Sequence, residues 1–585
     1  MAVMLDKSNP EKMMEQMREA WQFTDPIAIA KDEAAAFVQK ALSAAQKDGA
    51  LPGAEAAPFV VEQPADPKNG DLACNIAMVN AKTFGMAPRK IAEALLAAAP
   101  PIENSIIEKV EVAGPGFINL YLAQSWFSGR VMQAVVCGED YGRTHHGKGE
   151  KVNVEFVSAN PTGPMHLGNA RGGALGDVLA SCFDWAGYEV EREFYINDAG
   201  NQITKFGKSL AARYLQQVKG EDAVEFPEDG YQGEDIKERA AEFLAQNGPG
   251  WAEKPEAELE QALVDYALPK NIQDMQDHLA KYRISYDVWF RESSLHQSGA
   301  VERAIDKLKA LDATYEKEGA LWMKGDEDDK DNVLVRANGV PTYFAADIAY
   351  HIDKFERGFT SLIDVWGADH HGHIARMQNA LTAAGYKGEA LDVVLMQFVK
   401  LVRDGQPVRM SKRTGKAITL SDLLDEVPID SARFLFNMRE PGSSIEFDLD
   451  QAVAQDSDNP VYYVQYAHAR ICSIERALAE ESIAFEPAVA FGGADRLTTG
   501  EERDLIRKVA AFPGVLVTAA TGRNPAGVTR YLMDLATGFH KFYTACHIKG
   551  EEAPLLQARL ALALATKNVL KNGLSMLKVT VPDKM

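Results

Sequence analysis

The sequence predicts an α/β fold centred on a doubly wound parallel sheet, and three observations support that expectation. A strand-like run rich in β-branched residues, 152–157, leads through an Asn/Gly/Pro loop into a helical pattern of small residues that starts near Leu167. Later apolar runs, at 361–367 and 393–402, lie among further helical patterns, as parallel strands with crossover helices require. After about residue 455 strand patterns disappear and long helical patterns continue to the end.

Changes in composition divide the chain into four segments. Residues 1–25 are polar and rich in Met, so we expect a loosely attached extension, whereas residues 26–145 mix helical and strand patterns and indicate an α+β domain. The sheet is expected within 146–454. Charged, helix-prone sequence at about 200–330 indicates an insertion between its two halves. Residues 455–585 are expected to form a helical bundle.

The composition is typical of a globular protein rather than a membrane or secreted one. Of the 585 residues, 46% are hydrophobic and 25% are charged, and no apolar run reaches the roughly 18–20 residues that a membrane span needs. The first residues lack the apolar region of a signal peptide. The cysteines are far apart and form no CxxC pair, which argues against structural zinc and disulfides and favours a cytoplasmic location. They are Cys74, Cys137, Cys182, Cys472 and Cys546.

The net charge of −22 is unusual for a protein that binds nucleic acid, so its distribution matters. Residues 460–585 contain 15 Lys and Arg against 12 Asp and Glu, a balance of +3. The rest of the chain contains 47 basic and 72 acidic residues, a balance of −25. The asymmetry has the sign expected if the C-terminal part contacts phosphates, although it proves nothing by itself.

The loop after the first strand contains His166-Leu167-Gly168-Asn169. A helix that starts directly after a strand and loop offers its N-terminus, with free N–H groups and a positive dipole end, to phosphates. Taken alone this tetrapeptide is weak evidence, because a His beside a Gly in a loop is more often structural than catalytic.

A second basic loop, MSKRTG at 410–415, lies in the other half of the predicted sheet. On its own such a loop is more often a solvated turn. A bound polyphosphate, however, needs hydrogen-bond donors on both sides. His166 and Lys412 would supply one donor from each half of the sheet. The two loops together therefore predict a nucleotide site.

Six segments of the chain resemble bacterial-type arginyl-tRNA synthetases, which belong to class I. They are SANPTGPMHLGNARGG, TYFAADIAYH, WGADHHGH, RMSKRTG, NPVYYVQYAHARICSI and FHKFYTACH. The resemblance implies a Rossmann-type class I catalytic core with an inserted segment, an N-terminal α+β domain that contacts tRNA and a C-terminal all-α anticodon-binding domain. The sequence departs from the HIGH and KMSKS patterns at Asn169, Arg409 and Arg413, and it retains Lys412.

The resemblance also implies the reaction. L-arginine would attack the α-phosphate of ATP to form an arginyl-adenylate and release pyrophosphate, and transfer to tRNA(Arg) would release AMP. Mg²⁺ would accompany ATP without a dedicated protein site, and we expect a monomer. The implied catalytic residues are His166, Asn169 and Lys412. The implied nucleotide-binding residues are His166, Gly168, Asn169, Gly367, Asp369, His370, Met410, Ser411 and Lys412.

A guanidinium substrate requires carboxylates in planar, bidentate geometry. By resemblance, the arginine site would contain Glu155, Asn160, His166, Tyr343, Asp347 and His371. Tyr343 and Asp347 are four residues apart, so on a helix they share a face. Without the resemblance, Glu155 and Asp347 would more simply be surface charges.

The histidine-rich segment GADHHGH, 367–373, could instead bind a metal, since His370 and His373 are one helical turn apart and zinc sites use such ligands. It follows a strand and resembles the G-x-D-Q-x-x-H element of class I synthetases. We therefore assign it to nucleotide and substrate, and we predict no metal site.

Aromatic and polar side chains of the helical segment are candidates for stacking on and pairing with unstacked tRNA bases. They are Tyr463, Gln465, Tyr466, His468 and Lys541, with Phe539 and Tyr543 beside them. The simpler interpretation is that aromatics at helical spacing belong to the core. The resemblance further implies tRNA contacts around Asn75, Asn80, Lys82 and Phe84.

Three other functions fit the sequence less well. A class I synthetase for another amino acid, or a related small-molecule ligase, would not need the paired acidic residues, and a non-catalytic tRNA-binding relative would have lost His166 or Lys412. A nicotinamide oxidoreductase needs a G-x-G-x-x-G turn followed by an acidic ribose ligand, which the sequence lacks.

Overall fold

A parallel sheet forms the centre of the molecule. The computed structural model describes residues 9–103, 105–325, 331–408 and 418–585. Five strands of the described chain pair in the order β12-β11-β5-β6-β7, all parallel. In chain order this is 5-4-1-2-3, so the order reverses between β5 and β11, as in doubly wound folds. The strands are β5 (Lys151–Glu155), β6 (Glu189–Ile196), β7 (Val288–Arg291), β11 (Ser361–Gly367) and β12 (Leu391–Met396).

Helices cover both faces of this sheet. Helix α7 (Leu167–Trp185) packs on one face with Val152, Val154 and Ile363. On the other face, Leu362 and Leu391 pack against α12 (Ala300–Ala310), α13 (Tyr343–Glu356) and α14 (His371–Ala383). Gly176 lets α7 approach the strand closely, since a Cβ there would lie 2.2 Å from the ring of Phe156.

The segment expected as a single insertion contains one strand of the sheet, because β7 lies between two added parts. The first part is three helices with their own core, α8 (Gly200–Lys219), α9 (Glu234–Asn247) and α10 (Glu256–Lys281). The second adds α11 (Glu292–Gln297) and α12, and an antiparallel sheet of β8 (Thr314–Lys317), β9 (Ala320–Met323) and β10 (Asn332–Val335).

The N-terminal domain is an antiparallel sheet, β1-β2-β4-β3, covered by helices. Its elements are α2 (Pro26–Lys47), β1 (Val61–Glu62), β2 (Leu72–Cys74), α3 (Ile76–Val79), α4 (Ala81–Phe84), α5 (Pro88–Ala97), β3 (Ile107–Ala113), β4 (Phe117–Leu122) and α6 (Gln124–Cys137). The sequence predicts a loosely attached extension at residues 1–25, but the described part of it, from residue 9, packs on the domain. Residues Pro10–Trp21 form α1, whose Met13 and Met17 are buried in the core and which packs on α6.

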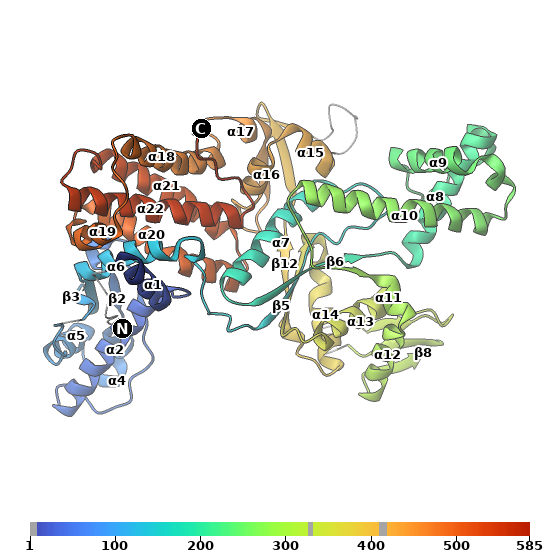
Figure 1. Cartoon of the computed structure of the whole chain (residues 1–585). Helices are drawn as coiled ribbons and strands as arrows, with labels where there is room; N and C mark the ends of the chain where they lie inside the picture. Colours follow the sequence, from blue (N-terminus) through green and yellow to red (C-terminus); the bar gives the residue numbers. More distant parts are fainter. Residues whose placement is uncertain (1–8, 104, 326–330, 409–417) are drawn as a thin grey trace.

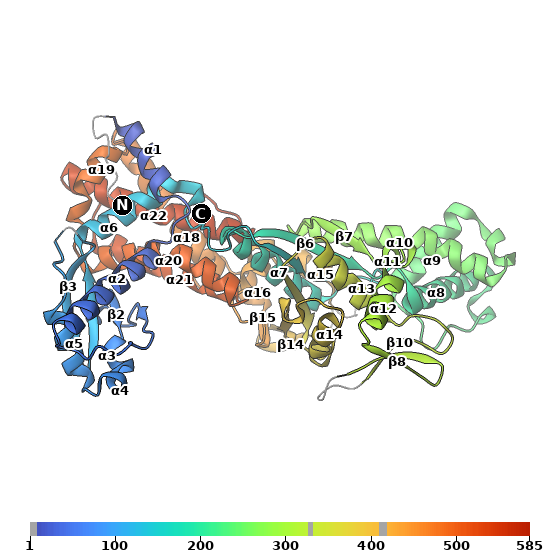
Figure 2. The same ribbon diagram turned by 90° about the horizontal axis from the view of Figure 1, so that it is seen from below.

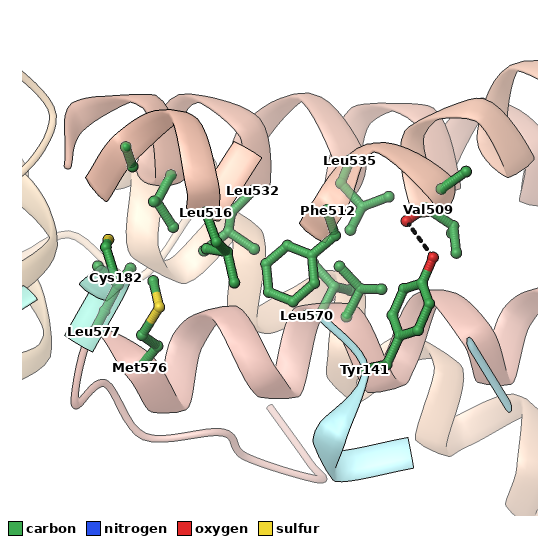
Figure 3. Packing of buried hydrophobic residues seen from close by; sticks show 14 of the residues in the cluster. Tyr141, Cys182, Val509, Phe512, Leu516, Leu532, Leu535, Leu570, Met576 and Leu577 are labelled. Carbon is green, nitrogen blue, oxygen red and sulfur yellow. Dashed lines mark hydrogen bonds between the residues drawn. The ribbon is translucent and has the colours of Figure 1, made fainter. Parts of the chain in front are cut away.

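The C-terminal domain is helical throughout. It comprises α18 (Pro460–Glu480), α19 (Pro487–Gly493), α20 (Gly500–Thr521), α21 (Ala526–Ala545) and α22 (Ala553–Met576). Figure 3 shows its core around Phe512, which packs among leucines of several helices. The Tyr141 hydroxyl donates to the Val509 carbonyl at 3.0 Å, which attaches the segment after α6 to this core.

A small sheet and three short helices connect the central parallel sheet to the helical domain. They are β13 (Val399–Arg403), β14 (Gln406–Val408), β15 (Ile445–Asp448), α15 (Leu420–Glu426), α16 (Ile429–Phe436) and α17 (Leu449–Val453). The helical and N-terminal domains form one end of an elongated molecule, and α8–α10 project from the other (Figure 1). The perpendicular view shows the same arrangement (Figure 2). None of the described helices is long and apolar enough to cross a membrane.

Candidate active site

The carboxyl ends of β5 and β11 meet where the strand order reverses, the usual position of a ligand site in a doubly wound sheet. His166 is the residue before α7 and its side chain is exposed, although partial loss of hydration lowers its pKa. The imidazole is therefore neutral near pH 7 and can donate one hydrogen bond.

Asn169 has a defined structural part in this turn. Its side-chain oxygen accepts the backbone N–H of His166 at 2.9 Å, so the amide closes the first turn of α7 and orients the residue before it. Gly168 lies between them, and a Cβ there would lie 3.2 Å from the His166 ring.

The chain after the second basic loop returns to the same turn. Thr419 forms a bridge with His166, and the Leu420 N–H donates to the Met165 carbonyl at 2.9 Å. The candidate residues Met410, Ser411 and Lys412 lie outside the described residues.

After β11, the chain presents the third candidate group at the same edge of the sheet. Gly367 ends the strand and is half-buried, and Asp369, His370 and His371 are exposed at the start of α14. His370 lies 3.6 Å from Asp369, whereas His373 lies 3.3 Å from Asp347. The two histidines that suggested a metal site thus face different carboxylates.

Below this edge, three carboxylates form a row across the sheet. Asp364, Glu155 and Glu193 are register neighbours on β11, β5 and β6, and each is at most 7% exposed. Like charges placed side by side are destabilising unless cations compensate them. The sheet therefore needs basic partners on this face.

Helix α13 and the residue after it provide those cations. The Lys354 ammonium donates to Glu155 at 2.7 Å and to Asp364 at 3.1 Å, and Arg357 pairs with Glu193 at 2.7 Å. Glu155 was predicted to bind substrate arginine. In the structure the Lys354 ammonium binds one of its oxygens and the Ser158 hydroxyl, at 2.8 Å, binds the other, so Glu155 forms part of the framework of the sheet.

His351 completes the row. Its Nδ1 faces the Asp347 carbonyl at 2.8 Å and its Nε2 faces the Asp364 carboxylate at 2.9 Å. Both partners are acceptors, so both ring nitrogens donate and the imidazole is protonated. Burial opposes this charge, but the bond to Asp364 raises the pKa of His351 above its usual value.

A second pair of carboxylates has no lysine or arginine partner among the described residues. Glu292 starts α11 directly after β7 and is 8% exposed, and Asp347 lies on α13. Burial raises the pKa of Glu292, a hydrogen bond from the Tyr195 hydroxyl lowers it, and the charge of Asp347 raises it again. Their nearest bases are histidines, His296 at 3.7 Å from Glu292 and His373 at 3.3 Å from Asp347.

Glu292 was not predicted from the sequence. The available signal was a carboxylate two residues after the short apolar run VWF, at the carboxyl end of a parallel strand. That strand lay inside the segment expected as an insertion. Of the other predicted arginine contacts, Tyr343 is 73% exposed at the start of α13 and Asn160 is exposed in the loop after β5.

The predicted tRNA-binding residues separate into surface and interior groups. Tyr466 and Lys541 are exposed and Tyr463 is half-buried. Gln465 and His468 are buried, where Gln465 donates to Asp430 and Thr580 and the His468 Nδ1 faces the Pro582 carbonyl at 3.1 Å. The last two therefore hold the C-terminal tail rather than face outward.

Two cavities adjoin on this surface, of 680 Å³ and 550 Å³, and Tyr466 and Arg470 line both. The Arg470 guanidinium lies over the rings of Tyr466 and Tyr543 at 4.9 and 5.0 Å. The larger cavity is also lined by Arg476, Lys549 and Lys584. Aromatic rings held beside several cations suit unstacked bases and their phosphates.

The N-terminal domain carries a 590 Å³ cavity lined by Asn75, Phe117 and Asn119 among others. Phe117 is 40% exposed, which is unusual for a large apolar side chain. Of the other predicted contacts here, Lys82 is exposed, while Asn80 and Phe84 are buried.

Comparisons with known proteins agree with this architecture. The family model for the catalytic domain of class I (R) tRNA synthetases matches residues 130–472. The arginyl-tRNA synthetase N-terminal domain matches 32–122, and the DALR anticodon binding domain matches 464–585.

The arginine–tRNA ligase of Caldanaerobacter subterraneus subsp. tengcongensis is 56% identical over 566 residues, which cover 96% of this chain and 99% of that protein. This chain belongs to the bacterial-type arginyl-tRNA synthetase family. A second relative, the arginine–tRNA ligase of Ruminiclostridium cellulolyticum, is 52% identical over 540 residues, 92% of this chain and 95% of that protein.

Arginyl-tRNA synthetases also share its fold. The Thermus thermophilus enzyme superposes with a TM-score of 0.70 at 23% identity, covering 93% of this chain and 99% of that one. As a class I arginyl-tRNA synthetase, the protein uses ATP and charges tRNA(Arg) with arginine.

Proposed function

We propose that the protein forms arginyl-adenylate at the edge of the sheet between β5 and β11 and then transfers arginine to the 3′ end of tRNA(Arg). The supporting observation is the bridge between Thr419 and His166, which returns the chain from the 410–415 loop to the start of α7. His166 and Lys412 would stabilise the charge that develops on the α-phosphate and the leaving pyrophosphate, with Asn169 orienting His166.

The arginine guanidinium is assigned to Glu292 and Asp347. A planar cation with five N–H groups can bridge two carboxylates that have only histidines beside them, whereas Glu155 already pairs with Lys354. Lysine carries a single ammonium and would leave one carboxylate without an adequate partner, which a half-buried site penalises.

The tRNA would be bound at both cavities of the helical domain and at the cavity of the N-terminal domain, with unstacked bases on Tyr466 and Phe117. Mg²⁺ enters as a complex with ATP, and the enzyme acts as a cytoplasmic monomer. Light scattering of the purified protein tests the oligomeric state.

ATP–pyrophosphate exchange with each amino acid, with and without tRNA(Arg), tests the reaction. The expected result is exchange with arginine in the presence of tRNA and none above background with lysine. Exchange with another amino acid, or none with arginine and tRNA together, would contradict the assignment. Product release gives a second check, because each charged tRNA should yield one AMP and one pyrophosphate.

A further inference from the structure

Arg171, in the second turn of α7, is a buried cation whose partners are all neutral. Its side chain is fully buried, and its guanidinium donates to the main-chain carbonyls of Gln397 at 2.6 Å, Glu440 at 3.1 Å and Ser443 at 2.8 Å. Within the part of the chain that the structure describes, no carboxylate pairs with it, and its Nε is buried without a hydrogen-bond partner. Burial accordingly lowers the pKa of Arg171 to about 10.

Arg433 provides a comparison within the same molecule. It is also fully buried and also donates to two main-chain carbonyls, those of Leu577 and Tyr282 at 2.6 and 3.0 Å. Its third partner is the carboxylate of Asp177, which neutralises its charge. Arg433 therefore forms an ordinary buried ion pair, whereas the charge of Arg171 remains uncompensated.

The carbonyls that Arg171 binds lie near the carboxyl ends of the strands, at the edge of the sheet where ATP is proposed to bind. Gln397 directly follows β12, whose last residue, Met396, is the register partner of Gly367 on β11. The Gln397 N–H donates to the Pro441 carbonyl at 3.0 Å, so the two segments held by Arg171 also hold each other. Helix α7 packs on β5 and β11 (Figure 1), and a Cβ at its Gly172 would lie 3.6 Å from the side chain of Met396.

The contacts of Arg171 affect both the main chain and the electrostatic potential at this edge. Three carbonyls from two segments fix the main chain beside the end of β12 against the first turns of α7. An unpaired cation five residues after His166 also adds to the positive potential of the helix N-terminus, and low-dielectric surroundings transmit that potential well. Both effects favour an anion bound at this edge.

We propose that Arg171 is a positioning residue for ATP, which holds the chain at Gln397 and Ser443 in place and supplies a positive charge beneath the bound polyphosphate. This inference rests on the proposed placement of ATP between β5 and β11. It assigns no contact between Arg171 and the substrate, since the guanidinium is buried.

The test compares Arg171→Met and Arg171→Lys with Arg433→Lys in pyrophosphate exchange and thermal unfolding. We expect Arg171→Met to raise the KM for ATP about 10-fold while the KM for arginine changes less than about twofold. Arg171→Lys keeps the charge but cannot span three carbonyls, so its KM for ATP should lie between those of the wild type and Arg171→Met. Arg433→Lys should lower the unfolding temperature without a selective change in the KM for ATP.

The inference is wrong if the KM for ATP is unchanged in the folded Arg171 variants, or if the KM values for ATP and arginine rise together as in a general loss of structure. If Arg171→Met does not fold, the KM values for ATP and for arginine in Arg171→Lys test the inference instead. Absence of arginine-dependent exchange in the wild-type enzyme would instead contradict the proposed function, so the two failures are distinguishable.

Discussion

At the scale of single residues, the environment of each carboxylate determines its role. Glu155 and Glu292 both follow or end parallel strands, yet Glu155 is held by the Lys354 ammonium and Glu292 by no stronger base than a histidine. The first therefore belongs to the framework of the sheet, and the second is available to a cationic substrate.

Glu292→Gln should raise the KM for arginine about 10- to 100-fold, because a hydrogen bond to a charged group contributes about 1.5–3 kcal/mol. The KM for ATP should stay within about twofold, since Glu292 follows β7, two strands away from β5, which leads to the start of α7. Steady-state exchange kinetics measure both constants. The exposed Glu356→Gln on the same side of the sheet is the control, and an equal effect in both variants would refute the assignment.

The arginine KM should also depend on pH. Glu292 must be ionised to pair with a guanidinium, and burial raises the pKa of its carboxyl above the ordinary 4.5. Protonation therefore begins at a higher pH than for an ordinary glutamate, and the KM for arginine should rise as pH falls toward that raised pKa. A profile of KM against pH from 5 to 8 shows this, and the acid limb should disappear in Glu292→Gln. A flat wild-type profile would count against the idea.

At the scale of secondary-structure elements, α7 and α13 perform different tasks on the two faces of one sheet. The start of α7 presents His166, and α13 neutralises the buried row of Asp364, Glu155 and Glu193. The geometry of the site therefore depends on contacts that involve no substrate.

Asn169→Ala should remove the bond that closes the first turn of α7 and reduce stability by about 0.5–2 kcal/mol, with slower adenylate formation because His166 loses its support. Asn169→Asp keeps an acceptor but places a negative charge near the phosphates. Asn169→Asp should therefore unfold at the wild-type temperature but have a higher KM for ATP than the wild type. If both variants match the wild type in exchange, Asn169 has no part in the site.

Lys354→Met should destabilise the protein by about 3–5 kcal/mol, because it leaves Glu155 and Asp364 buried beside each other without their shared cation. Thermal unfolding followed by tryptophan fluorescence measures the change. Lys400→Met removes an exposed pair with Glu446 at 3.0 Å and should cost at most about 1 kcal/mol. Similar shifts in the two variants would show that the buried row does not depend on Lys354.

At the scale of the whole molecule, the cavities proposed to bind tRNA and the sheet edge proposed to form the adenylate belong to different domains. These domains lie along an elongated chain (Figure 1). The C-terminal tail packs between the helical domain and the segments around α16 and the end of α10. Asp430 of α16 binds Thr580 and Gln465, and Arg283 donates to the Lys578 carbonyl at 2.7 Å.

Tyr466→Ala should weaken binding of tRNA(Arg) about 5- to 150-fold, since stacking of a base on an aromatic ring is worth about 1–3 kcal/mol. Filter binding or fluorescence titration at fixed salt gives the dissociation constant. Tyr386→Ala, which lines neither cavity, serves as the control and should leave tRNA binding unchanged. An unaltered dissociation constant in Tyr466→Ala would exclude its cavities as a base-binding site.

The sequence alone determined the order of the domains, the strand–loop–helix turn at His166 and the family resemblance, because periodicity and short motifs are local properties of the chain. It also indicated Asp347, whose charge acts on Glu292, and Tyr466, which is exposed. It did not reveal that α1 is docked, because burial of Met13 and Met17 depends on α6.

Only the tertiary structure decided which charges neutralise one another. Glu155 and Lys354 are 199 residues apart, and no local pattern shows that they meet. Nor does any local pattern show that the charge of Asp347 acts on Glu292, or that three carbonyls surround Arg171. The reason is physical. Local propensities and periodicity follow from the backbone and its near neighbours, whereas the free energy of a buried charge depends on whichever distant groups the fold brings into contact with it.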